Sequence, residues 1–199
     1  MSERLCAAIF ALFMLCGVPS LSAAEPIEVA VATDVELPPA AVWERMSDFS
    51  VAHHYVPGLT GTEITTSRKR GEGASRRVYQ EGGDYLQETI TQWSPGEGFV
   101  LRLHRGKKPM APFKQAQFRY HMEALDAERT RVTLAIVALM PLGSLGEWLG
   151  DWLARPALAE ELVQVAAGLK HYYETGEPAG DADRERLAAQ VRVLPTPAE

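Results

Sequence analysis

Cysteine is nearly absent from this sequence. The 199 residues hold two cysteines, Cys6 and Cys16, and both lie within the first 24 residues. Those residues have the pattern of a secretory signal, with a basic start at Arg4, an apolar core over residues 5–15 and the small residues Ser22-Ala23-Ala24 before a cleavage point. A chain cut after Ala24 would contain no cysteine, which excludes disulfides, thiolate metal sites and cysteine nucleophiles from residues 25–199.

Long hydrophobic runs are scarce as well. The apolar core of the predicted signal is shorter than the ~20 residues that a membrane-spanning helix requires, so cleavage and export to the periplasm are favoured over an uncleaved N-terminal membrane anchor. Lipid attachment is disfavoured, because Met14 and Leu15 stand before Cys16 where a lipoprotein signal has small residues. The remaining chain is long enough for one domain with its own hydrophobic core.

Positive charge is limited. The chain has 20 Lys and Arg residues against 26 Asp and Glu residues, a formal net charge of −6, which argues against a general nucleic-acid binder. Its basic cluster, Arg68-Lys69-Arg70 with Arg76-Arg77, falls on predicted hairpin strands, where alternation favours a solvated rim. The sequence also has no nucleophile elbow, zinc-protease motif, phosphate loop or dinucleotide fingerprint, so we expect no cofactor and no bound metal.

Alternation of apolar and polar residues predicts seven strands. The first covers residues 27–35, and two short helices are predicted after it, at 40–46 and 49–56. The later strands are predicted at 62–68, 75–80, 85–93, 99–104, 115–125 and 130–140. Short turns such as Gly82-Gly83-Asp84 separate them, so neighbouring strands must be antiparallel.

One long amphipathic helix follows the strands. The apolar residues that step by four, three, four and three along a single helical stripe are Leu158, Leu162, Val165, Leu169 and Tyr172. A curved sheet can close around such a helix, so we predict an α+β fold with seven antiparallel strands wrapped around it. A short amphipathic helix is expected over 141–153, and residues 178–199, rich in Pro, Ala and charge, are expected to form a poorly ordered tail.

Several short motifs accompany this order of elements. They are Val42-Trp43-Glu44, Ser47-Asp48-Phe49, Pro57-Gly58, Gly73-Ala74-Ser75-Arg76, Glu88 and Gly168-Leu169-Lys170 followed by Glu174-Thr175-Gly176. Together they resemble the SRPBCC superfamily, also called START-like or polyketide cyclase/dehydrase-like, over roughly residues 27–177. The resemblance implies an exported bacterial member with a helix-grip domain over residues 25–177 and a deep apolar cavity between sheet and C-terminal helix. It does not imply one activity, because the superfamily includes carriers, receptors, cyclases and co-chaperones.

The inward-facing residues of such a fold are the expected lining of the cavity. They are Trp43, Tyr55, Phe99, Leu101, Leu103, Phe118, Tyr120, Met122, Leu134, Trp148, Leu162, Val165 and Leu169. Trp148 and Trp152 lie four residues apart and so share a helix face. They form either a lid that touches a membrane transiently while ligand exchanges, or the end of the core.

Arg76, Glu88 and Tyr120 are the weak candidates for catalysis. Arg76 and Glu88 fall on neighbouring strands of a hairpin, where opposite charges can meet. Facing inward, they would orient a polar ligand group or act as an acid/base couple, but an exposed ion pair near the rim is the favoured interpretation. Tyr120 either hydrogen-bonds a ligand or is an ordinary core tyrosine. The adjacent His53 and His54 lack partners at ligand spacing, so packing is favoured over metal binding.

The sequence therefore predicts an exported protein that holds a hydrophobic small molecule or lipid and binds no nucleic acid. A cyclase- or dehydratase-like enzyme that uses the same cavity is the first alternative. A protein-interaction module without a pocket is the second. None of these hypotheses fixes an oligomeric state.

Overall fold

One antiparallel sheet and one long helix dominate the molecule. The computed structural model describes residues 26–141 and 154–195. The strands are β1 (Ile27–Val35), β2 (Leu59–Ile64), β3 (Ser75–Gln80), β4 (Tyr85–Ser94), β5 (Gly98–Arg105), β6 (Lys108–Pro109), β7 (Gln115–Ala124), β8 (Thr130–Leu139) and β9 (Arg192–Val193). The helices are α2 (Pro39–Met46), the 3₁₀ turn η1 (Ala52–His54), α4 (Arg155–Thr175) and α5 (Asp181–Ala188). The predicted α+β helix-grip architecture is confirmed, and the described residues form nine strands in place of the predicted seven.

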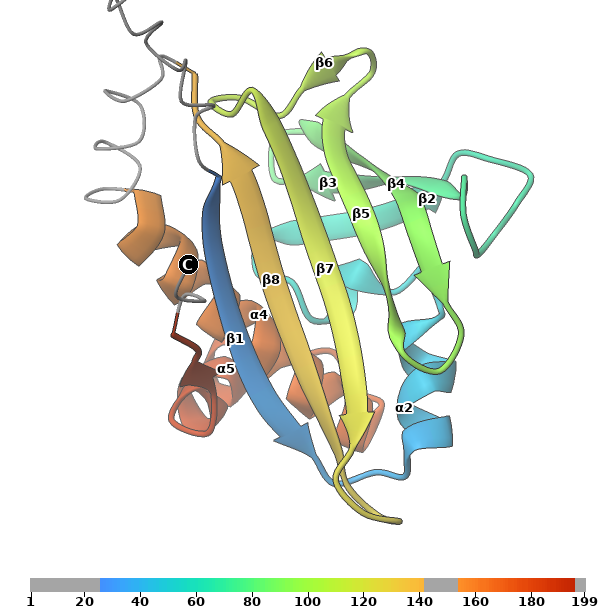
Figure 1. The fold of residues 1–199 in the computed structure, drawn as a ribbon, viewed down its shortest axis with the longest axis vertical. Coiled ribbons are helices and arrows are strands. Elements are labelled where there is room, and N and C mark those ends of the chain that lie inside the picture. Colours follow the sequence, from blue (N-terminus) through green and yellow to red (C-terminus); the bar gives the residue numbers. More distant parts are fainter. Residues whose placement is uncertain (1–25, 142–153, 196–199) are drawn as a thin grey trace, which may run out of the picture.

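The sheet runs in the order β2-β3-β4-β5-β7-β8-β1-β9, and β6 pairs with β5 off this path. It curves around α4, while α2 lies at the end of the molecule where β5 begins (Figure 1). β7 and β8 pair over their full lengths, from Gln115 opposite Leu139 to Ala124 opposite Thr130. Their alternating residues bury one face, as the apolar pattern predicts.

The long helix α4 packs against β1 and the inside of the sheet. Its buried residues include Leu162, Val165 and Leu169 of the predicted stripe. Leu158 and Tyr172, at the two ends of the stripe, are partly buried against the same core. Tyr173, which the stripe leaves out, is 1 % exposed. The helix is buried on more than one side because α5 packs against it, which a single-stripe pattern does not anticipate.

A glycine fixes how closely α4 approaches the rest of the fold. A Cβ atom built on Gly168 would lie 2.3 Å from the backbone oxygen of Tyr55, the residue that follows η1. No side chain larger than hydrogen fits at that distance without a backbone shift. The Gly168-Leu169-Lys170 motif therefore has a packing reason, because it lets the helix contact the backbone at Tyr55 directly.

The C-terminal tail differs from its predicted disorder. Leu187 of α5 is 5 % exposed, so the short helix buries an apolar side chain against the domain. β9 then pairs with β1 through Val31 opposite Val193 and Ala32 opposite Arg192. These contacts cover the edge of β1, which would otherwise present unpaired backbone groups. The composition of the tail predicted disorder because the tail has few apolar residues, and only some of them pack against the domain.

Some predicted features lie outside the described residues. These are the signal over residues 1–24, the short helix over 141–153 and, within it, Trp148 and Trp152. Among the helices of residues 26–141 and 154–195, none combines the length and the apolar character needed to cross a membrane.

Candidate ligand-binding interior

The inner face of the sheet is buried unevenly from one end to the other. Toward α2, Ile90, Phe99 and Tyr120 are 1 %, 5 % and 4 % exposed. Toward β6, Leu86 and Phe118 also point inward by strand alternation, yet both remain partly exposed. Leu103 and Ala116 at the same end are buried, so apolar surface stays exposed there at individual side chains such as Leu86 and Phe118.

The β6 end of the interior is the one where α4 begins. The side chain of Arg155 donates a hydrogen bond from Nη1 to the backbone oxygen of Glu28 at 2.7 Å, which fixes the start of α4 beside the start of β1. Ile27 of β1 pairs with Ala138, which in turn pairs with Ala116 of β7. The start of α4, the start of β7 and the β6 hairpin therefore share one end of the molecule.

Stacked aromatic rings fill the opposite, α2 end. Phe99 stacks on Tyr120 with ring centroids 4.6 Å apart, and Trp93 stacks on Phe99 at 5.5 Å. Trp43 of α2 covers Trp93, with centroids 5.0 Å apart. Such ring pairs contribute about 0.5–1.5 kcal/mol each beyond their buried area. They give the interior a rigid closed end.

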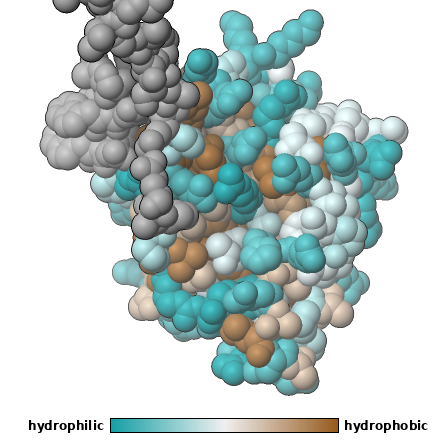
Figure 2. Space-filling model, viewed as in Figure 1, coloured by the Kyte–Doolittle hydropathy of each residue, from teal (hydrophilic) through white to brown (hydrophobic). Residues whose placement is uncertain are grey.

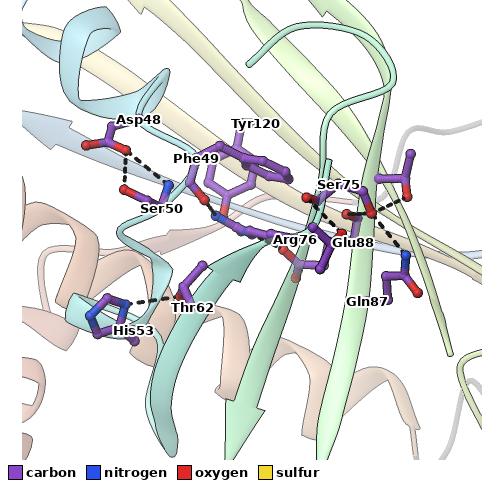
Figure 3. Close-up of polar contacts among 12 residues, drawn as sticks. Asp48, Phe49, Ser50, His53, Thr62, Ser75, Arg76, Gln87, Glu88 and Tyr120 are labelled. Carbon is purple, nitrogen blue, oxygen red and sulfur yellow. Dashed lines mark hydrogen bonds and ion pairs between the residues drawn. The ribbon is translucent and has the colours of Figure 1, made fainter. Parts of the chain in front are cut away.

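A buried ion pair joins β3 to β4 on this inner face. Arg76 and Glu88 are direct cross-strand partners, and Arg76 Nε donates to Glu88 Oε2 at 2.5 Å (Figure 3). The predicted pairing is confirmed, but its expected exposure at the rim is wrong, since the two side chains are 3 % and 13 % exposed. Long charged residues are usually solvated, which is why the pattern favoured the rim.

The guanidinium of Arg76 has two further contacts, both with Phe49. Its Nη1 donates to the backbone oxygen of Phe49 at 2.9 Å, and its Cζ lies 4.1 Å from the centre of the Phe49 ring. Burial alone would lower the pKa of Arg76, but the Glu88 carboxylate together with Tyr55 and Tyr120 outweighs burial and raises that pKa above its ordinary value. Arg76 is therefore a permanent buried cation.

Two tyrosine hydroxyls meet close to this ion pair. The hydroxyl oxygens of Tyr55 and Tyr120 lie 3.0 Å apart, and either can be the donor. Burial raises the pKa of Tyr55 and raises that of Tyr120 well above its ordinary value, while the positive charge of Arg76 opposes both shifts. Both phenols thus stay protonated near neutral pH and can donate hydrogen bonds.

Most of the residues predicted to line the cavity face the interior. Those that are buried are Tyr55, Phe99, Leu101, Leu103, Tyr120, Met122, Leu134, Leu162, Val165 and Leu169. Trp43 and Phe118 are partly buried against the same core, and Trp148 lies outside the described residues. Contact of these residues with a ligand stays a prediction. Sequence reasoning missed Phe49 and Tyr173 as parts of this interior, although the Asp-Phe motif pointed to Phe49.

His53 and His54 pack at the surface of the domain. His53 Nδ1 lies 3.1 Å from Thr62 Oγ1, and the His54 ring stacks on Tyr172 with centroids 5.1 Å apart. Burial and the neighbouring His54 lower the pKa of His53. Within residues 26–141 and 154–195, no three His, Cys, Asp or Glu side chains gather in a way that could hold a metal ion.

The sequence profile of the family described as polyketide cyclase / dehydrase and lipid transport matches residues 26–174. The chain belongs to this family. The predicted SRPBCC resemblance is thereby confirmed, and the family joins cyclases and dehydrases with proteins of lipid transport. A comparison with curated protein sequences gives no significant match.

Solved structures show how widely this family's fold is shared. The Zhui aromatase/cyclase from Streptomyces sp. R1128 is similar with a TM-score of 0.53 at 17% identity, covering 77% of this chain and 99% of the other. Ara h 8.0201 is similar with a TM-score of 0.53 at 14% identity, covering 74% and 97%. The di-domain ARO/CYC BexL is similar with a TM-score of 0.57 at 14% identity, covering 73% and 45%. Identities this low establish a shared fold and leave the chemistry to the site itself.

Proposed function

We propose that this protein is an exported binding protein that holds a hydrophobic small molecule or lipid between the sheet and α4. The observation that carries the proposal is the uneven burial of the inner face. Leu86 and Phe118 keep exposed apolar surface that a folded core would normally bury, and a ligand would cover it. Covering apolar surface contributes about 25 cal/mol per Å² to binding.

The export part of the proposal rests on the N-terminal sequence. Residues 1–24 combine a basic start, a short apolar core and a small-residue cleavage site. We expect cell fractionation of the source organism to place the protein in the periplasm, with a mature N-terminus at Glu25. A full-length chain recovered from the membrane fraction would support the anchor alternative.

A second candidate function is catalysis of the cyclase or dehydratase kind in the same interior. The observation that favours it is the position of the buried ion pair beside two protonated phenols. Tyr120 can donate a hydrogen bond to a ligand carbonyl, and the partly accessible Glu88 carboxylate can accept a proton from an adjacent carbon. Arg76 would stabilise negative charge that develops on the ligand oxygen.

Titration with a fluorescent fatty-acid probe tests the proposed binding. We expect saturable binding by the wild type, weakened in Phe118→Ala by about 1–2 kcal/mol because part of a ring contact is lost. Val100→Ala is the matched control, since strand alternation points that residue to the outer face. The proposed binding interior is wrong if the wild type does not bind the probe. It is also wrong if Phe118→Ala and Val100→Ala lose the same affinity for the probe.

A further inference from the structure

One continuous stretch of this acidic protein carries only positive charge. Residues 98–122 contain no Asp or Glu but hold the six basic residues Arg102, Arg105, Lys107, Lys108, Lys114 and Arg119, within a chain of net charge −6. This stretch covers β5, β6 and all but the last two residues of β7. The end of β5, the whole of β6 and the start of β7 lie together at the β6 end of the interior. Hydrophilic side chains crowd that end of the surface, with small hydrophobic patches between them (Figure 2).

The sheet forks at the same place. β5 pairs with β7 from Gly98 opposite His121 to Arg102 opposite Gln117. Beyond Arg102, β5 pairs with β6 instead, while β7 continues beside β8. The two strands diverge visibly in Figure 1. Their backbones are therefore not joined by ladder hydrogen bonds at this end.

A hollow of about 450 Å³ occupies the fork. Leu103 and Ala116, which belong to the buried inner face, line it together with outward-facing residues. Four basic side chains also line it: Arg102, Lys107, Lys108 and Lys114. The fork thus places several cations around a hollow whose wall includes two buried apolar residues of the inner face.

The basic residues near the fork differ in whether the described part of the chain neutralises them. Arg105 pairs with Asp84 at 2.6 Å, and Arg119 pairs with Glu28 at 3.0 Å. Within the described ranges, neither Lys108 nor Lys114 forms an ion pair with an acidic side chain, and the same holds for Arg102 and Lys107. Several unpaired cations around one hollow favour an anionic ligand group.

A buried histidine holds the hairpin that presents two of these lysines. His104 is 6 % exposed, with Nδ1 2.7 Å from the backbone oxygen of Gly106 and Nε2 2.8 Å from Thr89 Oγ1. Since a carbonyl can only accept, Nδ1 carries the proton in the first contact. Gly106 has φ +62°, a conformation that favours glycine, in the turn before Lys107 and Lys108. The hydrogen bonds of His104 and the backbone conformation of Gly106 therefore fix the turn that presents Lys107 and Lys108.

We infer that this fork binds the anionic headgroup, carboxylate or phosphate, of an amphiphile whose apolar tail lies in the interior. The inference rests on the proposed binding function and adds the class of ligand. Arg76 already has a carboxylate partner in Glu88, which distinguishes it from the four cations of the fork. The tail can follow the inner face from Leu103, whose cross-strand partner is Glu88, toward the partly exposed Phe118.

Calorimetric titration of two probes that differ only in the headgroup tests the inference. Dodecanoate is anionic and dodecanol is neutral, and both are used below their aggregation limits. We expect the double variant Lys108→Gln/Lys114→Gln to bind dodecanoate at least tenfold more weakly than the wild type, equal to about 1.4 kcal/mol. Its affinity for dodecanol stays unchanged. The matched control Lys69→Gln/Arg70→Gln removes the same charge elsewhere and leaves both affinities unchanged.

The outcomes separate this inference from the proposed function. If the wild type binds both probes and the fork variant loses no preference for dodecanoate, the headgroup site is wrong while the binding interior stands. If the wild type binds neither probe, both ideas fail.

Two further titrations distinguish a carboxylate from a phosphate headgroup, and a bound amphiphile from free phosphate or a membrane surface. Dodecyl phosphate in place of dodecanoate decides between the two headgroups, and either preference supports the site. Inorganic phosphate alone should not compete at concentrations where dodecyl phosphate does. If the fork variant loses binding to phosphatidylglycerol vesicles but keeps its full affinity for dodecanoate and dodecyl phosphate, the fork is a membrane-docking surface and the inference is overturned.

Discussion

The buried pair of Arg76 and Glu88 gives the sharpest test of the interior described above. Arg76→Met removes the guanidinium and leaves a carboxylate with a 13 % exposed side chain and no charged partner on the inner face. Loss of one partner from a buried ion pair costs about 3–5 kcal/mol. The variant also leaves the backbone oxygen of Phe49 without its donor, which adds roughly 1 kcal/mol or more. We therefore expect Arg76→Met to lose about 4–6 kcal/mol of the free energy of unfolding.

The double variant Arg76→Met/Glu88→Leu separates charge burial from packing. Replacing a buried pair by apolar side chains of similar size is often neutral or stabilising, so the double variant should be more stable than Arg76→Met alone. Urea unfolding at pH 7, followed by tryptophan fluorescence, measures both free energies. If Arg76→Met loses less than about 1 kcal/mol, or if the two substitutions destabilise additively, the pair is solvated and the reasoning is refuted.

Three other substitutions test the packing and the charges around α4. Gly168→Ala should destabilise the fold by about 1–3 kcal/mol, since its methyl group meets a backbone oxygen, whereas a Cβ on Gly61 meets nothing within 4 Å and Gly61→Ala should cost less than half as much. Leu187→Ala should lose about 2–3 kcal/mol if α5 belongs to the fold, against less than ~0.5 kcal/mol for Val193→Ala, whose side chain is exposed; equal, negligible losses would restore the disordered tail. The hydrogen bond from Arg131 on β8 lowers the pKa of Asp34. The Asp34 carboxylate therefore stabilises the fold above its unfolded pKa, and this stabilisation is lost as the pH falls through the lower folded pKa. Urea midpoints from pH 6 to pH 3 should therefore fall more steeply in the wild type than in Asp34→Asn, and parallel curves would contradict this.

The sequence predicted most strands of this fold well because they bury one face. The exception is β2, predicted at 62–68 and found at Leu59–Ile64, which has no fully buried residue. β3 begins and ends where alternation places it, at Ser75 and Gln80, and β7 and β8 differ from prediction by a single residue at one end. Periodicity of two is a strong signal when the opposite face is solvated. The two missed strands, β6 and β9, hold two residues each, too few to show any period.

The site was harder to predict than the fold, because it depends on burial between elements far apart in the sequence. The pairing of Arg76 with Glu88 follows from hairpin register, but their burial comes from Phe49, 27 residues before Arg76. The hydroxyl pair of Tyr55 and Tyr120 joins residues 65 positions apart. A sequence pattern records which face a residue occupies and not what covers that face.

The fork between β5 and β7 was not predicted, although the charge pattern that marks it is present in the sequence. The acid-free stretch over residues 98–122 can be read directly from the chain. Its meaning required the topology, because only the divergence of β5 from β7 brings two buried apolar residues of the inner face and the unpaired lysines around one hollow.

The measurement that tests the central claim most directly is native mass spectrometry of the protein purified from the periplasm of its source organism. We expect a population heavier than the mature chain by one small apolar or amphiphilic molecule, which collisional activation or extraction with organic solvent releases. A spectrum showing only the bare chain, together with no displacement of a fluorescent fatty-acid probe by any lipid extract, would contradict the account.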